Sequence, residues 1–468
     1  MSFCQILTAK QKALEINLDH HIYGTFAEIG AGQEVARNFF QAGGAAGTIA
    51  KTISAYDMVV SDDIYGKEKS GRYVCDARLE KMLSREYEQN ITRLSKVRDN
   101  TQFFAFADTV AAKSYSGKGD CHGWLGVRFQ DKPGAEYSEA IIHVRMRDQE
   151  NVQQQEALGI IGVNLIYACF RLTENRQAFI SSLMDGLTTR RIRIDMIRVK
   201  GPAFKHVDSR ILSLELVKRK FCKAIMFDEN GDILQATDYI YKKNLLVLRG
   251  SFRPLTHVNL DMLKTGLEKF KEQLPKEEHN SIMVLPEISM SKLIERGEVD
   301  HDDFLARIEL LSAMGQKVLI TSFDDYAPLN EYLTKYSKKN IAFVTGVYNV
   351  QEILDLKKYE SNPAGILGGL GQLFGHSSKL YVYPVQDDER EGELKTLDTI
   401  NYDDSLSFLF LYLYENGLIE NIDNYNPEYS QIWSRTVLSM IQKGEKGWEK
   451  MVPEIVAKTV KSKKLFLK

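Results

Sequence analysis

Five apolar runs in the second half of the chain constrain its fold more than any other feature. They are residues 245–249, 282–286, 317–322, 341–347 and 379–385. Each run is continuously apolar instead of alternating with polar residues, which indicates strands that are covered on both faces. Helical patterns at 258–274, 301–314 and 326–337 lie between these runs. We therefore predict an open parallel sheet with helices on its faces, a Rossmann-like α/β domain over residues 241–400.

The first half of the chain has a different pattern. Its expected strands are rich in aromatic and β-branched residues, and they fall at 101–113, 123–130, 139–146 and 191–199. Helical patterns occupy residues 76–97, 152–171 and 208–222, and an Asn-Gly turn at 230–231 predicts a hairpin within 224–241. The elements alternate without the spacing of parallel units. We expect an N-terminal α+β domain with a mixed sheet over residues 1–240.

The last part of the chain, residues 401–468, is expected to be helical. Two stretches, Leu406–Tyr414 and Trp433–Ile441, would present apolar faces that need a partner. That partner is either the second domain or another subunit, so a homo-oligomer is one of the expected arrangements.

Composition excludes several classes of protein. Hydrophobic residues make up 44% and charged residues 26% of 468 residues, the balance of a soluble globular chain. The formal charge of −2 gives no general attraction to nucleic acid or to an anionic membrane. The five cysteines include no Cys-x-x-Cys pair, the start of the chain lacks a secretory pattern, and no apolar run reaches the roughly 20 residues of a membrane span. We expect a cytoplasmic protein without a membrane or nucleic-acid partner.

Several motifs in the first half could suggest chemistry, but the simpler structural interpretation is favoured for each. Gly30 and Gly32 resemble part of a methyltransferase motif, yet Glu34 replaces its third glycine, which favours a tight turn. The run Asp120-Cys121-His122 holds adjacent potential zinc ligands, which rarely converge on one ion, so no metal is expected. His143 is expected to be structural. The basic residues at 190–223 are either a solvated face or a phosphate-binding surface.

Ligands of open α/β sheets bind at the carboxyl ends of the strands, so the segments that follow the five runs are the candidate site. These segments include Gly250-Ser251-Phe252, Glu287, residues 321–325, residues 346–349 and a glycine-rich loop at 365–375. The loop contains Gly369 and Gly371, and it either closes over a ligand or packs its glycines against a neighbouring helix. We predict that Gly250, Ser251, Phe252, Gly369 and Gly371 contact the ligand.

The stretch from Gly250 to Leu260, GSFRPLTHVNL, resembles the opening motif of the nicotinate/nicotinamide mononucleotide adenylyltransferases, G-x-F-x-P-x-[H/T]-x-G-H-L. The matches are Gly250, Phe252, Pro254, Thr256 and Leu260. The whole chain also resembles a group of uncharacterised bacterial proteins that are sometimes given this nucleotidyltransferase name. The resemblance implies a phosphate-binding turn after the first strand of a Rossmann-like sheet, with Thr256, His257 and Asn259 as catalytic residues.

The chain departs from that motif at two positions. Val258 stands at the glycine position and Asn259 at the second histidine, the residue that contacts phosphates in the family. An asparagine amide donates a hydrogen bond but carries no charge, so transition-state stabilisation should be weaker. Two hypotheses follow: a nucleotide- or phosphometabolite-binding protein with a degenerate transferase site, or a non-enzymatic, self-assembling scaffold. The sequence leaves both the cofactor and enzymatic activity open.

Overall fold

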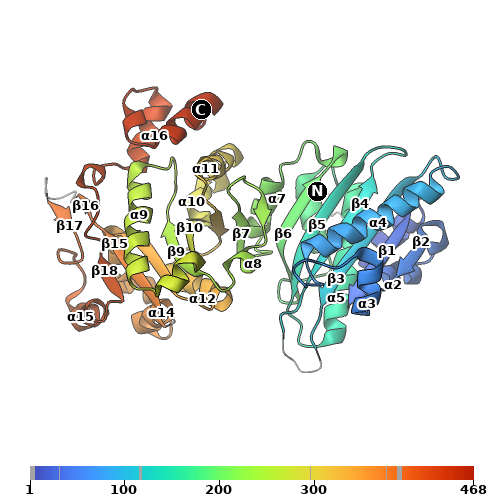
Figure 1. Cartoon of the computed structure of the whole chain (residues 1–468), viewed down its shortest axis with the longest axis horizontal. Coiled ribbons are helices and arrows are strands. Elements are labelled where there is room, and N and C mark those ends of the chain that lie inside the picture. Colours follow the sequence, from blue (N-terminus) through green and yellow to red (C-terminus); the bar gives the residue numbers. More distant parts are fainter. Residues whose placement is uncertain are drawn as a thin grey trace. The chain divides into compact units, whose positions relative to one another are not determined.

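A computed structural model describes residues 6–30, 32–114, 119–295, 297–375, 377–386 and 393–467. The chain forms two compact units, residues 1–222 and residues 223–468. Figure 1 shows the helices and strands of both units. None of the helices in the described part of the chain is long and apolar enough to cross a membrane.

The first unit is built on a six-stranded sheet with the order β2-β1-β3-β4-β5-β6. β1 pairs in parallel with both β2 and β3, whereas the pairs from β3 to β6 are antiparallel. This confirms the predicted mixed sheet. The strands are β1 (Ile22–Gly30), β2 (Ile49–Ile53), β3 (Gln102–Ala111), β4 (His122–Gln130), β5 (Tyr137–Met146) and β6 (Ile192–Lys200).

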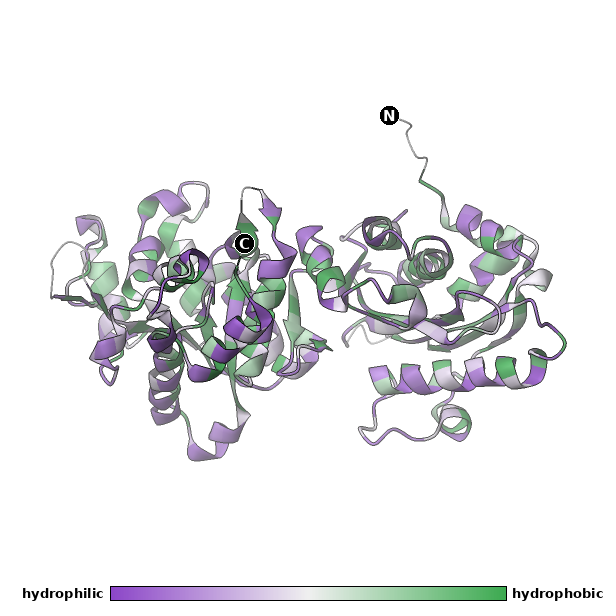
Figure 2. Cartoon of the chain, turned by 90° about the horizontal axis from the view of Figure 1, so that it is seen from above, coloured by the Kyte–Doolittle hydropathy of each residue, from purple (hydrophilic) through white to green (hydrophobic). Residues whose placement is uncertain are grey.

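Helices cover both faces of this sheet, as the view in Figure 2 shows. α4 contacts β1, β3 and β4, while α5 contacts β4 and β5 and also packs against α1 and α2. A Cβ added at Gly162 of α5 would lie 2.4 Å from the Val35 side chain of α2, so the glycine permits this close helix contact. The helices are α1 (Ala9–Asn17), α2 (Glu34–Ala42), α3 (Met58–Tyr65), α4 (Asp76–Leu94), α5 (Asn151–Arg171), α6 (Arg176–Leu183) and α7 (Ser209–Lys218).

The second unit contains an eight-stranded sheet with the order β18-β15-β14-β9-β10-β13-β7-β8. All pairs from β18 to β13 are parallel. The chain runs from β9 outward to β10 and β13, then returns to β14 on the other side of β9, which is the doubly wound order of a Rossmann-like sheet. The strands are β7 (Ala224–Phe227), β8 (Ile233–Leu234), β9 (Asn244–Arg249), β10 (Ile282–Ser289), β13 (Val318–Thr321), β14 (Ile341–Gly346), β15 (Ser378–Tyr383) and β18 (Ile419–Asn421).

Continuous burial explains why the apolar runs predicted this sheet. Leu245, Leu246, Val247 and Leu248 of β9 are each at most 1% exposed, so side chains on both faces of the strand are covered. The helices of this unit are α8 (Ala236–Ile240), α9 (His257–Glu272), α10 (Met290–Leu293), α11 (His301–Ala313), α12 (Tyr326–Ser337), α13 (Val347–Ile353), α14 (Gly365–Phe374), α15 (Ser407–Glu415), α16 (Ser434–Lys443) and α17 (Glu454–Lys463).

Three features differ from the expected arrangement. The hairpin of β7 and β8 forms as predicted, but β7 pairs with β13, so the second unit begins at Lys223 instead of residue 241. Residues 401–468 lie within the second unit and add β18 to its sheet. The glycine-rich segment at 365–375 is the helix α14 instead of a loop, because Asn330 donates hydrogen bonds to its final carbonyls and Tyr359 packs on Gly369.

Candidate functional site

A cavity of about 620 Å³ lies at the carboxyl ends of the parallel strands in the second unit. It spans the point between β9 and β14 where the order of the sheet reverses, the usual ligand position in this fold. The strand ends contribute Leu248–Ser251, Ser289, Asp324, Asp325, Gly346 and Tyr383. Further lining residues come from helices and from the C-terminal segment, among them Asn259, Lys292, Asn349, Glu352, Tyr359, Gly369, Trp433 and Arg435.

Arg249 and Glu287 form a buried ion pair at one side of the cavity. They face each other across β9 and β10, and the Arg249 Nε atom lies 2.7 Å from Glu287 Oε2. Arg249 also donates to the carbonyls of Phe323 and Asp324, and Thr321 donates to Glu287. Because these partners come from the ends of three adjacent strands, the network holds those ends together.

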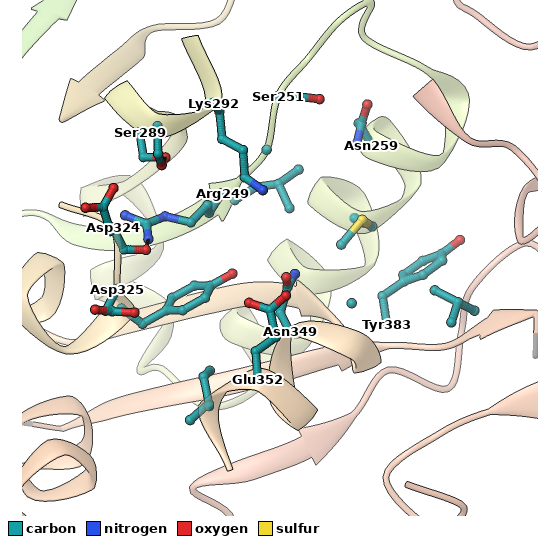
Figure 3. Close-up of a pocket in the computed structure, with 18 of the residues that line it drawn as sticks. Arg249, Ser251, Asn259, Ser289, Lys292, Asp324, Asp325, Asn349, Glu352 and Tyr383 are labelled. Atoms are coloured by element: carbon teal, nitrogen blue, oxygen red, sulfur yellow. Dashed lines mark hydrogen bonds between the residues drawn. The ribbon is translucent and has the colours of Figure 1, made fainter. Parts of the chain in front are cut away.

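The remaining charged groups around the cavity are of both signs. Lys292 is exposed and forms no ion pair with any described residue, whereas Lys358 lies 3.0 Å from Glu352. Figure 3 shows Lys292 and Glu352 extending toward the cavity from opposite sides. Asp324 and Asp325 follow β13. A ligand that carries both an anionic group and hydrogen-bond donors would find complementary partners here.

The structure brings four of the predicted residues to this cavity: Gly250, Ser251, Asn259 and Gly369. Phe252 does not line it, because its ring is buried beneath Gly250 and is 1% exposed. Gly371 also lies outside the lining residues.

Thr256 and His257 do not line the cavity either, because they serve the start of α9. Thr256 and Asn259 form a capping box, in which the Asn259 Oδ1 atom accepts from the Thr256 backbone N–H and hydroxyl. The His257 ring stacks on Tyr429 at a centroid distance of 5.1 Å, and its backbone N–H donates to the Met451 carbonyl. Partial burial lowers the pKa of His257. His257 thus contacts the C-terminal segment.

Sequence reasoning missed the part of the cavity wall that is formed after residue 429. This wall consists of Ser430, Ile432, Trp433, Ser434 and Arg435, and the Arg435 guanidinium lies 5.0 Å from the Trp433 ring centre. The sequence signal was the apolar stretch from Trp433, which predicts a helix that needs a partner. Trp433 instead precedes α16 as its N-cap residue and contacts the cavity.

His122 and His143 of the first unit are part of a hydrogen-bonded network. His122 Nδ1 lies 2.9 Å from His143 Nε2, and His143 in turn bonds to Asp195. His143 is 2% exposed, in agreement with a structural role. Within the described residues, no group of three or more His, Cys, Asp or Glu side chains could hold a metal ion.

The basic segment at 190–223 is largely neutralised by carboxylates. Arg191 pairs with Asp148, and Arg198 pairs with Asp76 and Glu80. Further pairs are Lys200–Glu139, Arg210–Asp208 and Arg219–Glu215. This pairing favours the solvated-face interpretation over a phosphate-binding surface.

No protein-family profile and no curated protein matches the chain. Among solved structures, the competence/damage-inducible protein CihA of Agrobacterium tumefaciens is 15% identical, with a TM-score of 0.26 over 34% of this chain and 94% of that chain. A CinA-superfamily protein of Enterobacter cloacae is 13% identical, with a TM-score of 0.26 over 36% of this chain and 95% of that one. At TM-scores this low the likenesses carry no argument.

Proposed function

We propose that the second unit binds a nucleotide or another phosphorylated small molecule in the cavity at the carboxyl edge of its sheet. The observation that carries this proposal is the position of the cavity, at the reversal point of a doubly wound sheet and beside the turn from β9 to α9. Backbone and side-chain donors at such turns commonly hold phosphate groups.

The lining residues suggest how such a ligand would be held. The Lys292 ammonium and the Ser251 hydroxyl would bind phosphate oxygens, and the exposed lysine would provide charge that no described carboxylate already neutralises. Asn259 would add its amide group, since its Oδ1 atom is already held by Thr256. Trp433 and Tyr359 would provide apolar surface for a ring or a sugar.

The catalytic roles of Thr256, His257 and Asn259 stay a prediction within this proposal. Asn259 is the member that lines the cavity, and Thr256 would position it through the capping box. His257 would act indirectly, because its contacts with Tyr429 and Met451 hold the segment that carries Trp433. We therefore expect the protein to bind the nucleotide but to catalyse transfer only slowly, because an amide stabilises developing negative charge less than an imidazolium would.

Replacing Lys292 with alanine tests the phosphate-binding part of the proposal. ATP or nicotinamide mononucleotide should raise the melting temperature of the wild-type protein. Lys292→Ala should weaken binding by roughly 10- to 100-fold, since a hydrogen bond to a charged group contributes about 1.5–3 kcal/mol. Lys443→Ala, on an exposed lysine outside the cavity, is the matched control. A melting temperature that no phosphorylated ligand changes at millimolar concentration would contradict the proposal.

Self-assembly is a second candidate function, favoured by the exposed apolar side chains of α15. Phe408 is 88% exposed, Leu411 50% and Tyr412 58%. A scaffold protein would cover this surface with another copy of the chain. We expect light scattering to give a lower molar mass in solution for a Phe408→Asp, Leu411→Asp double variant than for wild type, because the assembly dissociates. A wild-type protein that is already monodisperse and monomeric would exclude this function.

A further inference from the structure

Two buried carboxyl groups of the first unit are not explained by the proposed function. Glu28 on β1 and Asp108 on β3 are aligned in the register of these parallel strands. Glu28 is 3% exposed and Asp108 is completely buried. Buried carboxylates are normally paired with a cation or satisfied by hydrogen bonds, so this arrangement requires an explanation.

The hydrogen bonds of the pair are incomplete. Glu28 Oε1 accepts from the Ala36 N–H in the first turn of α2, at 3.3 Å. Neither carboxyl oxygen of Asp108 has a hydrogen-bond partner among the described residues. A contact from the Ile29 N–H favours the ionised form of Asp108 but does not reach hydrogen-bond geometry. Asp108 therefore lies buried with two unsatisfied oxygens.

Gly32, which precedes α2, rests directly on this pair. A Cβ added at Gly32 would lie 2.0 Å from Asp108 Oδ1 and 2.3 Å from Oδ2, so the backbone at Gly32 is in close contact with the carboxyl group. The Gln33 side chain donates to the Gly30 carbonyl, which ties the start of α2 to the end of β1. This close packing leaves little room for a hydrated cation, whereas a proton needs none.

The surroundings disfavour two negative charges. Burial raises the pKa of Glu28 to about 8, although the N–H groups of Ala36 and Val35 lower it. The negative charge of Glu34 on α2 makes a smaller contribution that also raises the pKa. Burial and the charge of Glu28 likewise raise the pKa of Asp108. No cation within the described residues contributes to either shift. On the other side of β3, Asp108 pairs in register with Leu125 of β4, which is uncharged.

We propose that Glu28 and Asp108 share a proton that holds Gly32 and the N-terminal end of α2 against the sheet, and that loss of this proton releases them. With the proton present, Asp108 donates one hydrogen bond to Glu28, and the pair carries a single negative charge. The N–H groups of α2 stabilise this charge at Glu28. When the proton leaves, two like charges are buried side by side beneath Gly32. Gly32 and the N-terminal end of α2 can then separate from the sheet to admit water.

The sign of the pH dependence follows from the raised pKa values. An acid whose pKa rises from 4.5 to about 8 on folding places no electrostatic cost on the native state below the lower value. The cost grows as pH rises between the two values and is fully present above the higher one. Separation of Gly32 and the start of α2 from the sheet should therefore increase as the pH rises.

Hydrogen exchange measured by mass spectrometry on the full chain tests this proposal. Protection of the Val35 and Ala36 amides, corrected for the intrinsic pH dependence of exchange, should fall in wild type by up to roughly tenfold per pH unit between about 4.5 and about 8, and should level off above about 8. Glu28→Gln should remove this dependence, because its Oε1 atom can still accept from Ala36 and its amide can donate to Asp108. Glu34→Gln, which changes a carboxylate paired with Arg37, is the control that should retain the dependence.

Three outcomes would overturn the proposal. The first is the same pH dependence of protection in wild type and Glu28→Gln. The second is protection that responds to added or chelated Mg²⁺, Ca²⁺ or K⁺ instead of pH, which would assign a cation to the pair. If Glu28→Gln does not fold, Asp108→Asn provides the same test, and retention of the wild-type pH dependence in that variant is the third.

Discussion

Replacing Glu287 with alanine is expected to lower the free energy of unfolding of the second unit by about 3–5 kcal/mol, the usual cost of removing one partner of a buried ion pair. Glu287 is completely buried, and the side chain of its partner Arg249 is 7% exposed. Without Glu287 the guanidinium keeps its carbonyl partners at Phe323 and Asp324 but loses its counter-charge. Because Arg249 lines the cavity, ligand binding should weaken together with stability.

Urea unfolding followed by circular dichroism measures this effect. The control is Glu229→Ala, which removes the partner of Lys317 at a site where the Glu229 side chain is 46% exposed. Exposed pairs contribute about 0–1 kcal/mol, so this variant should unfold nearly as wild type does. The double variant Arg249→Met, Glu287→Leu should recover most of the loss, because it leaves no buried charge. A loss below about 1 kcal/mol for Glu287→Ala would show that water or rearrangement compensates the arginine.

Replacing Gly369 with alanine should have the next largest effect. The added Cβ would lie 2.1 Å from the Tyr359 ring, which packs against this turn of α14. The ring must move, although the Tyr359 hydroxyl is bonded to the Ile353 carbonyl. Overpacking of this kind typically costs about 1–3 kcal/mol. Tyr359 and Gly369 both line the cavity, so ligand affinity should also fall.

Gly371 provides a matched control on the same helix. A Cβ added there has no atom within 4 Å, and the residue lies outside the cavity. Gly371→Ala should stabilise α14 by up to about 1 kcal/mol, since alanine is the better helix former. Melting temperatures of the two variants should therefore move in opposite directions. Equal shifts would mean that helix propensity, and not contact with Tyr359, decides the effect at Gly369.

The elements of the second sheet could be predicted because their signals are local. Continuous apolar runs mark β9, β10, β13, β14 and β15, and amphipathic patterns mark α9, α11 and α12 to within a few residues. The parallel arrangement followed from the same pattern, since only strands covered on both faces remain apolar throughout. The position of the cavity at the strand ends followed in turn from the fold.

The composition of the cavity could not be predicted, because it depends on contacts between distant segments. Nothing near His257 in the sequence indicates that Tyr429 and Met451 engage it. Glycine disfavours helices, so the sequence of α14 predicts a loop. In the structure, contacts from Tyr359 and Asn330 supply the packing and hydrogen bonds that stabilise the helix. The pairing of β7 with β13 is equally non-local. The motif from Gly250 identified the right turn but only some of its contacts.

The wall formed by residues 430–435 has a consequence for the order in which the site is made. The strands that carry Arg249, Gly346 and Tyr383 leave the ribosome well before Trp433 and Arg435. A nascent chain that stops short of this wall can pair its central strands, yet it presents an open crevice without its final side. For the ligand proposed above, the complete cavity is therefore available only after residue 435 has left the ribosome, and until then the sheet depends mainly on its own packing.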